Sequence, residues 1–244
     1  MTRRASRRLM VIGTAGAFGL GAPLWAPPLL GTLPAFRIER VQISGTAFVD
    51  SAEIRELAAV PPNASVWDDG AEWEARVRAH EMVREARVRR VGMRAIEIRV
   101  IEVEPLALVP DGTLVPLDES GRRLPLDPSA EGLDLPILSG DGWMEEGRIS
   151  DTPALTALRA LGALREYDDA FYGLISEVRL LGAASIEIEL RESGRAERVL
   201  LPAVEPVRGL RRVEMALGHA ADSALTIADA RFEGQVILRT REEG

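Results

Sequence analysis

Residues 9–33, LMVIGTAGAFGLGAPLWAPPLLGTL, form a run without a single charged side chain. A run of this length can cross the hydrocarbon core of a bilayer, which is about 30 Å thick. Four arginines within residues 1–8 precede it, and basic flanks favour the cytoplasmic side. We therefore expect a cytoplasmic tail at 1–8, a transmembrane anchor at 9–33, and the bulk of the chain on the far side of the membrane.

A cleaved secretory signal is the alternative interpretation of the same segment. Its basic start and its apolar run rich in Gly and Ala fit such a signal. The run is long for a signal, however, and Pro23, Pro27 and Pro28 interrupt any cleavage site of small residues. The Pro27-Pro28 pair also predicts the end of a helix, or a break in it, near the outer face. We favour an uncleaved, single-pass anchor.

The charge balance changes sign after the tail. Residues 1–8 carry +4, whereas the remaining 236 residues carry 26 basic and 38 acidic groups, a net charge of −12. A nucleic-acid-binding protein would concentrate positive charge on its folded part, so no nucleic-acid partner is expected. Cysteine is absent, which excludes both a disulfide framework and a thiolate metal site.

Residues 36–103 carry the pattern of a small β-α-α-β-β domain. The run FRIERVQISG at 36–45 is typical of a strand that ends in a glycine turn. In the following segment, Asp50 and Glu53 have the spacing of a capping box, and Pro61-Pro62 predicts the end of this first helix. Helical spacing of apolar residues predicts a second helix from about Asp69 to Met82.

Two more strands follow, around a turn at Gly92-Met93. Strict alternation of apolar and charged residues places one apolar face on the second of them, and Ile101 breaks this alternation, so we expect a bulge or bend near it. Each strand and helix of the domain supplies one apolar face, and these faces should form its core. The residues expected to pack there are Val41, Ile43, Ile54, Leu57, Ile96, Ile98 and Val100.

The sequence pattern of residues 104–244 predicts a mixed β-sheet with helices packed on it. The expected fold class of the whole chain is therefore α+β. One helix is expected over 151–167, with Thr152 as its cap and leucines repeating along one side. A hairpin is expected around Ser193-Gly194, followed by a helix in EPVRGLRRVEMALGHA. The stretch RFEGQVILR, residues 231–239, is typical of a closing strand with a break at Glu233-Gly234.

The distribution of polar residues does not indicate an active site. Glutamates alternate along expected strands at Glu97, Glu102 and Glu104 and again at Glu187 and Glu189, which is the pattern of a solvated sheet face. The aspartates Asp68, Asp69, Asp111, Asp118 and Asp127 lie beside Gly or Pro, where they stabilise turns.

Metal and cofactor chemistry are equally unsupported. Neither His80 nor His219 has a second ligand at helical spacing, and no nucleotide-binding glycine motif occurs after the anchor. We expect no catalytic residue, no bound metal, no cofactor and no small-molecule substrate. An anchored hydrolase is a minor alternative, because no nucleophile and base are placed together in the sequence.

The order of elements and several short motifs resemble the FtsQ/DivIB family of bacterial cell-division proteins. The first domain resembles that family's POTRA domain, and later segments resemble its second domain and its closing strand. The segments that carry the resemblance are Val41–Gly45 (VQISG), Val83–Arg90 (VREARVRR), Ile96–Leu108 (IEIRVIEVEPLAL), Leu114–Leu124 (LVPLDESGRRL), Leu133–Gly140 (LDLPILSG) and Ala228–Arg239 (ADARFEGQVILR).

The resemblance implies a non-enzymatic scaffold of the divisome. Such a protein is a type II protein of the inner membrane, with its bulk in the periplasm at the division septum, and it recruits other division proteins. In the family, the closing region is where small coiled-coil partners, FtsB with FtsL, add a strand. The resemblance therefore assigns partner binding to Arg231, Phe232, Glu233, Gly234, Gln235 and Val236, with Phe232 as the anchor.

Two alternatives accompany this interpretation. A POTRA-bearing chaperone or transport accessory for outer-membrane proteins would also use strand addition, but such proteins usually carry tandem POTRA repeats or a barrel, for which the chain is too short. At the closing strand, Phe232 could instead pack into the core of its own domain, which would leave an ordinary last strand.

Membrane topology provides the first test. We expect a C-terminal reporter that is active only in the cytoplasm to be silent, because the +4 tail holds the N-terminus inside. Reporter activity measured in whole cells would contradict this orientation. A mature N-terminus found beyond residue 20 by sequencing of the purified protein would establish the cleaved signal instead.

Overall fold

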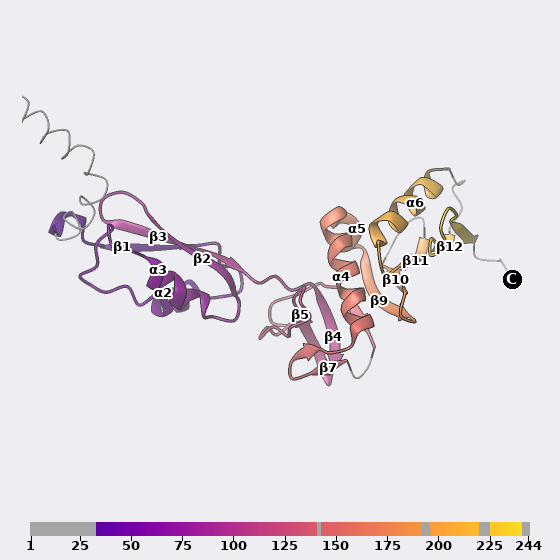
Figure 1. Cartoon of the computed structure of the whole chain (residues 1–244), viewed down its shortest axis with the longest axis horizontal. Coiled ribbons are helices and arrows are strands. Elements are labelled where there is room, and N and C mark those ends of the chain that lie inside the picture. Colours follow the sequence, from indigo (N-terminus) through magenta and orange to yellow (C-terminus); the bar gives the residue numbers. More distant parts are fainter. Residues whose placement is uncertain (1–32, 141–142, 192–195, 220–224, 241–244) are drawn as a thin grey trace, which may run out of the picture. The chain divides into compact units, whose positions relative to one another are not determined.

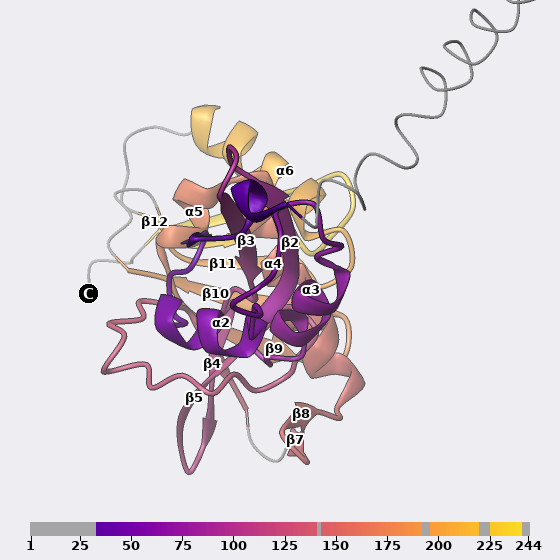
Figure 2. The same cartoon turned by 90° about the vertical axis from the view of Figure 1, so that its left-hand side faces the viewer.

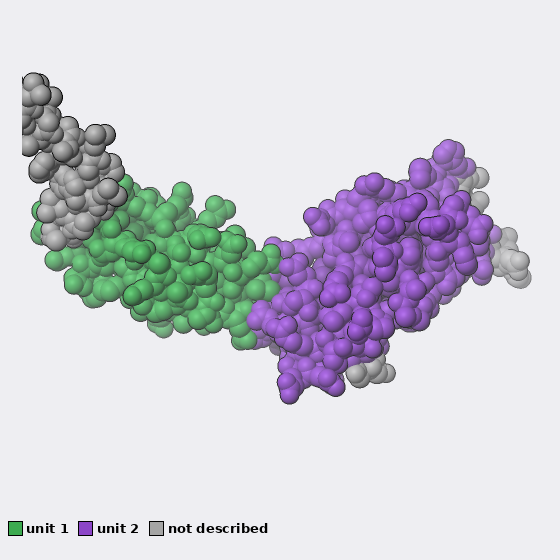
Figure 3. Space-filling view, viewed as in Figure 1, with its two compact units in different colours: residues 1–103 green, residues 104–244 purple. Residues whose placement is uncertain are grey.

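The computed structural model describes residues 33–140, 143–191, 196–219 and 225–240. The chain divides into two compact units between Val103 and Glu104 (Figures 1 and 3). The expected tail at 1–8 and all but the last residue of the expected anchor at 9–33 lie outside the described residues. No helix within the described ranges is long and apolar enough to cross a membrane.

Unit 1 has the predicted β-α-α-β-β order. Its three-stranded sheet has the order β1-β3-β2, with β1 parallel and β2 antiparallel to the central β3. Helix α2 contacts β1 and helix α3 contacts β2. The elements are η1 (Pro34–Phe36), β1 (Arg40–Ser44), α2 (Ser51–Ala58), α3 (Ala71–Arg78), β2 (Val83–Arg90) and β3 (Ala95–Glu102).

The first helix begins at the predicted cap, although only half of the capping box forms. Asp50 accepts a hydrogen bond from the backbone N–H of Ala52, at 2.8 Å. Glu53, the expected second half of the box, instead lies 3.3 Å from Nε2 of His80. The helix ends at Ala58, because Ala59 adopts a left-handed conformation with φ of 45°.

The second helix is shorter than predicted, since it ends at Arg78 rather than near Met82. A tight turn follows it, in which the His80 carbonyl accepts from the N–H of Val83 at 2.9 Å. Nδ1 of His80 also accepts from the N–H of Met82, at 3.1 Å. His80 therefore has a structural role, in which it directs the chain from α3 into β2.

Most of the predicted core of unit 1 is confirmed. Ile54, Ile96, Ile98 and Val100 are buried, whereas Val41, Ile43 and Leu57 are only half-buried. The predicted irregularity near Ile101 is also confirmed. Pairing between β2 and β3 shifts register between Val83 and Glu85, opposite Ile101, and the Ile101 side chain is exposed.

The expectation that all the alternating glutamates are solvated is wrong for Glu102, which is buried. It is only 7% exposed, and its carboxylate accepts three backbone N–H groups, from Ala47, Phe48 and Val49, at 2.8 to 3.0 Å. The carboxylate thus fixes the loop between β1 and α2. This loop starts at Gly45, where φ is 85° and an added Cβ would lie 2.1 Å from the carbonyl oxygen of Val100.

Unit 2 is built on an eight-stranded mixed sheet of order β13-β12-β11-β10-β9-β6-β4-β5. Helices α4 and α6 contact each other, and they contact β9 and β11 respectively (Figures 1 and 2). The strands are β4 (Ala107–Asp111), β5 (Thr113–Leu117), β6 (Ile137–Ser139), β7 (Met144–Glu145), β8 (Arg148–Ile149), β9 (Ile175–Leu181), β10 (Ser185–Leu190), β11 (Ala196–Pro202), β12 (Leu225–Asp229) and β13 (Ile237–Thr240). The helices are α4 (Thr152–Tyr167), α5 (Asp169–Gly173) and α6 (Pro206–His219).

The helix α4 supplies the centre of the core of unit 2. Leu158, Leu161 and Leu164 are buried against the sheet, as their spacing predicted. The cap is Asp151 rather than the predicted Thr152, since the Asp151 carboxylate accepts from the backbone N–H of Ala154 at 2.8 Å. Thr152 is instead the first residue of the helix.

Two strand predictions in unit 2 have different outcomes. β10 and β11 pair as an antiparallel hairpin, as predicted, although the expected turn at Ser193-Gly194 lies outside the described residues. The predicted closing strand over 231–239 is too long, because only Ile237–Thr240 pairs with β12. Residues 230–236 form the connection between these two strands.

The core of unit 1 can be tested with two isoleucines on the same strand. We expect Ile98→Ala, at a fully buried position, to lower the free energy of unfolding by about 2–5 kcal/mol. Ile101→Ala is the matched control at an exposed position, and it should change stability by no more than about 0.5 kcal/mol. Urea denaturation of a soluble fragment covering residues 33–244 measures both. Equal effects of the two substitutions would show that the apolar face is wrongly assigned.

Candidate partner-binding site

The eight-stranded sheet ends in two edges of different character. At one edge, β5 contains Pro116, whose carbonyl accepts the N–H of Leu124 at 2.8 Å, and Leu117 forms a bridge with Arg123. This edge is therefore partly covered by the chain itself. At the other edge, β13 pairs only with β12 among the described residues. An edge strand turns half of its N–H and C=O groups away from the sheet, where they can pair with another chain.

The register of β13 shows which side chains face the core. Ile237 lies opposite Asp229, and Leu238 lies opposite Ala228. Leu238 packs against the core, together with Val236 just before the strand. Ile237 and Arg239 point to the other face and are exposed. The inner face of β13 thus attaches the strand to the core, while its outer edge and its other face remain accessible.

The β12–β13 connection is held by an arginine from helix α6. Nη1 of Arg212 donates to the carbonyl oxygen of Phe232 at 2.6 Å, and Nη2 donates to that of Ala230 at 2.7 Å. Nε of Arg212 is buried and has no hydrogen-bond partner among the described residues. One guanidinium therefore fixes two carbonyls of a segment that has no regular structure.

A buried carboxylate holds the same connection from its start. Asp229 is 4% exposed and accepts three hydrogen bonds from Arg231, from the backbone N–H at 3.1 Å, from Nε at 3.0 Å and from Nη2 at 2.7 Å. The Arg231 side chain, more than the partial burial that opposes it, holds the pKa of Asp229 below its ordinary value. Arg231 is thereby committed to an internal ion pair, and its pKa is raised by the same contact.

The aromatic side chain of Phe232 projects from this connection. Phe232 is 47% exposed, and the centre of its ring lies 5.7 Å from the guanidinium carbon of Arg231. Phe232 does not belong to the core cluster of unit 2, in contrast to the alternative expectation that it packs inside its own domain. An exposed phenylalanine beside an open sheet edge is a suitable contact for another protein.

The six residues assigned to partner binding are thus adjacent, but they play different parts. Glu233 and Gly234 form a turn, in which Gly234 has φ of 76°, and Gln235 is exposed after it. Val236 is half-buried against the core. None of the six belongs to β13, so the backbone that is available for pairing lies at residues 237–240, which the sequence prediction did not assign.

The outer face of the sheet carries alternating charges on β9, β10 and β11, which lie inward of β12 and β13. Nη1 of Arg198 lies 3.0 Å from Oε1 of Glu187, and Nη2 of Arg179 lies 2.6 Å from Oε1 of Glu177. A depression of 350 Å³ on this face is lined by such side chains, including Glu189. Within its lining, Arg198 and Glu187 form an ion pair, and mostly charged side chains leave little apolar surface for a small molecule.

Acidic and histidine side chains that could have formed a catalytic or metal site lie in separate places. The Arg89 guanidinium, followed by the Ser44 hydroxyl, holds the pKa of Glu97 below its ordinary value. Glu104 pairs with Arg165 at 2.6 Å. In the part of the chain that the structure describes, no group of three or more His, Asp or Glu side chains is arranged to hold a metal ion.

Comparison with known proteins identifies relatives of one kind. Residues 36–102 match the family model described as "POTRA domain, FtsQ-type". The chain is 30% identical to "Cell division protein FtsQ" of Rhodothermus marinus, over 97% of this chain and 88% of the relative. It is 27% identical to the protein of the same name from Myxococcus fulvus, over 80% of this chain and 76% of the relative. It is 29% identical to the protein of the same name from Salinibacter ruber, over 84% of this chain and 83% of the relative.

The ion pair between the buried Asp229 and the half-buried Arg231 predicts a pH-dependent contribution to stability. Because the folded pKa of Asp229 is lowered, its stabilisation is complete above the ordinary value of 3.8 and is lost as the pH falls through the lowered pKa. We expect Asp229→Asn to cost about 1–3 kcal/mol near neutral pH, since a charged hydrogen-bonded group is removed. The difference from the wild type should shrink below pH 3.8.

Denaturant unfolding at a series of pH values measures this difference. Glu233→Gln is the matched control, because Glu233 is exposed in the same connection, and its effect should stay within about 0.5 kcal/mol. A cost of Asp229→Asn that does not change with pH would contradict the stabilising role of the ionised pair.

Proposed function

The chain belongs to the FtsQ family of bacterial cell-division proteins, and we propose that it is a non-enzymatic scaffold of the divisome, anchored in the inner membrane by a single segment. In this proposal, residues 1–8 are the cytoplasmic tail and residues 9–33 the anchor. The POTRA domain at 36–103 and the C-terminal β domain at 104–244 lie in the periplasm. The protein acts at the division septum, where it recruits other division proteins.

The open edge of β13 is the observation that carries this proposal. The strand is the last of an eight-stranded sheet, it contains no proline, and β12 is its only partner among the described residues. A strand from another protein can continue the sheet here, with backbone hydrogen bonds that supply affinity. The opposite edge is less suitable, because Pro116 cannot donate and its carbonyl is already bonded.

Specificity in this mode comes from side chains beside the added strand. Phe232 offers an exposed aromatic ring, and aromatic residues are frequent among the residues that dominate binding energy. The charge of Arg231 is already paired with Asp229, and its guanidinium lies near the Phe232 ring. Arg231 therefore contributes mainly through its position beside Phe232. We infer that the added strand pairs with residues 237–240 while Phe232 contacts a side chain of the partner.

The partners in this proposal resemble FtsB and FtsL, the small coiled-coil proteins of the divisome. A partner that continues the sheet needs an extended segment next to its helix. Arg239, which is exposed on β13 itself, offers such a partner a charged contact. This function involves no nucleic acid and no small-molecule substrate. It depends on an interface with other proteins and on a membrane anchor.

Substitution of the exposed aromatic residue tests the proposal. We expect Phe232→Ala to weaken binding of the coiled-coil partner by about 2 kcal/mol or more, as for an aromatic hot spot, while the domain stays folded. Isothermal titration calorimetry or a quantitative pull-down measures the affinity, and the unfolding midpoint reports on folding.

Met215→Ala is the matched control for this experiment. Met215 is another large, exposed apolar side chain of unit 2, located on α6, and its truncation should leave the affinity unchanged. Unchanged binding by Phe232→Ala would contradict the proposal. Loss of folding in Phe232→Ala would also contradict it, because it would give Phe232 a structural role instead.

A further inference from the structure

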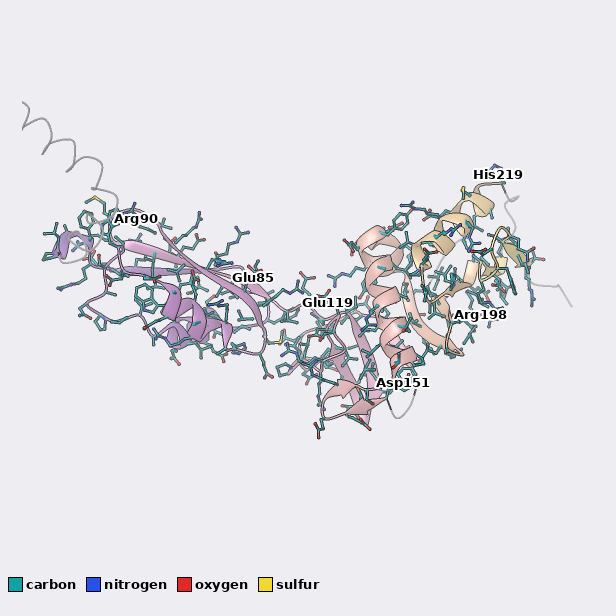
Figure 4. All side chains as sticks on the ribbon, in the orientation of Figure 1. Glu85, Arg90, Glu119, Asp151, Arg198 and His219 are labelled. Carbon is teal, nitrogen blue, oxygen red and sulfur yellow. The ribbon has the colours of Figure 1, made fainter. Side chains whose placement is uncertain are left out.

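One end of unit 1 brings together the start of the described chain and the turn between β2 and β3. Strand pairing places Arg40, which begins β1, opposite Ala95, which begins β3. The backbone N–H groups of Glu39 and Arg40 both donate to the carbonyl oxygen of Arg94, at 2.8 and 3.2 Å. Figure 4 shows Arg90, the last residue of β2, at this end. The β2–β3 turn is therefore next to the segment through which the chain enters the domain.

The side chains at this end include three exposed apolar residues. Leu33 is 46% exposed, Val91 is 37% exposed and Met93 is 62% exposed. Two of them flank Gly92, whose φ of 85° forms the turn. Turns that face water are normally built from small polar residues, so an exposed Val and Met at a hairpin turn are unusual.

Arginines surround these apolar residues. Arg37, Arg40, Arg90 and Arg94 are all exposed at the same end. The guanidinium of Arg90 lies 3.7 Å above the ring of Trp67. Arg94 is paired with Glu39 at 2.8 Å, while Asp68 and Asp69 accept the backbone N–H groups of Ser65 and Ala71. Among the described residues, Arg37 and Arg40 form no ion pair, so their guanidinium groups are available to another partner.

The apolar side chains are also directly connected to the charge-free segment. That segment ends at Leu33, which is the first described residue, and only η1 and three residues after it separate Leu33 from β1. If residues 9–33 span the bilayer, this end of unit 1 lies at the outer surface of the membrane. The tether is too short for the domain to move far from the headgroups, since each extended residue spans at most about 3.6 Å.

We propose that this membrane-proximal tip, formed by Leu33, Arg37, Arg40 and residues 90–94, binds the headgroup region of the phospholipid bilayer. The proposal rests on the anchoring proposed above. Apolar side chains flanked by basic ones are typical of surfaces that lie in the membrane interface. Arginine side chains bind phosphate oxygens through paired N–H donors, which suits lipid headgroups. Contact of this kind fixes the orientation of the POTRA domain on the membrane.

The absence of cysteine from the chain permits a direct test with a single fluorescent label. Met93→Cys places the label at the tip. Ala47→Cys is the matched control, because the Ala47 backbone contacts Glu102 at the opposite end of β3, about 25 Å away at the rise of an eight-residue strand. Each full-length variant is labelled with an environment-sensitive dye and reconstituted into vesicles of phosphatidylcholine and phosphatidylglycerol that contain nitroxide-labelled lipids.

We expect the label at residue 93 to show a blue-shifted emission and several-fold stronger quenching by the nitroxide lipids than the label at residue 47. Equal, weak quenching at both positions in protein that floats with the vesicles would overturn the proposed tip contact and leave the anchor intact. Failure of the full-length protein to float with the vesicles after alkaline extraction would overturn both the anchor and the tip contact.

Charge variants distinguish lipid binding from simple proximity. Replacing Arg37 and Arg40 together by Gln should reduce the quenching at residue 93 and make it more sensitive to salt. Replacing Arg78 and Arg84 by Gln removes the same charge near the start of β2, at the opposite end, and should leave the quenching unchanged. Equal effects of the two pairs, or quenching that depends on a second membrane protein in the vesicles, would overturn a specific contact between the tip and the lipid.

Discussion

An open sheet must leave backbone hydrogen-bonding groups unpaired at its two edges. In this structure, the central question is which of these edges the chain itself covers. In unit 2 the β5 edge is partly closed by the chain itself, through Pro116 and the segment that follows it. The β13 edge is open among the described residues. Such an edge is a risk for aggregation unless a partner covers it. The contrast between the two edges gives the sheet a direction in which it can be extended.

The open edge is short, and two arginines hold the connection that precedes it. Arg212 fixes two carbonyls there, and the buried Asp229 orients Arg231 through three hydrogen bonds. Together they present Phe232 beside β13 without giving the connection regular structure. Binding residues held in advance lose less conformational entropy when a partner arrives. A fixed backbone at Phe232 beside an open strand edge suits the proposed scaffold.

Sequence periodicity predicted the elements well, because apolar alternation and helical spacing are local signals. The β-α-α-β-β order, the bulge near Ile101 and the core leucines of α4 all follow from such signals. Contacts between distant residues could not be predicted in this way. Glu102 follows the buried positions 96, 98 and 100 of β3 at the same two-residue spacing, but no local signal indicates that its carboxylate binds a loop more than fifty positions earlier.

The same limit applies to the candidate site. The position of Phe232 near the end of the chain was clear from its motif, but nothing local indicates that Arg212 supports it from α6. The strand was predicted too long because RFEGQVILR alternates well enough to suggest pairing throughout, whereas the turn at Gly234 and the Arg231–Asp229 pair remove its first half from the sheet. Which strand forms the edge depends on the whole sheet order, and no single segment encodes that order.

Hydrogen exchange measured by mass spectrometry, with and without the coiled-coil partner, tests the account most directly. Strand addition at the open edge would protect the amides of β13, residues 237–240, because their outward N–H groups would gain partners. The amides of β5, at residues 113–115 and 117, would exchange at the same rate in both samples. Protection of β5 instead, or binding that leaves the exchange of β13 unchanged, would contradict the account.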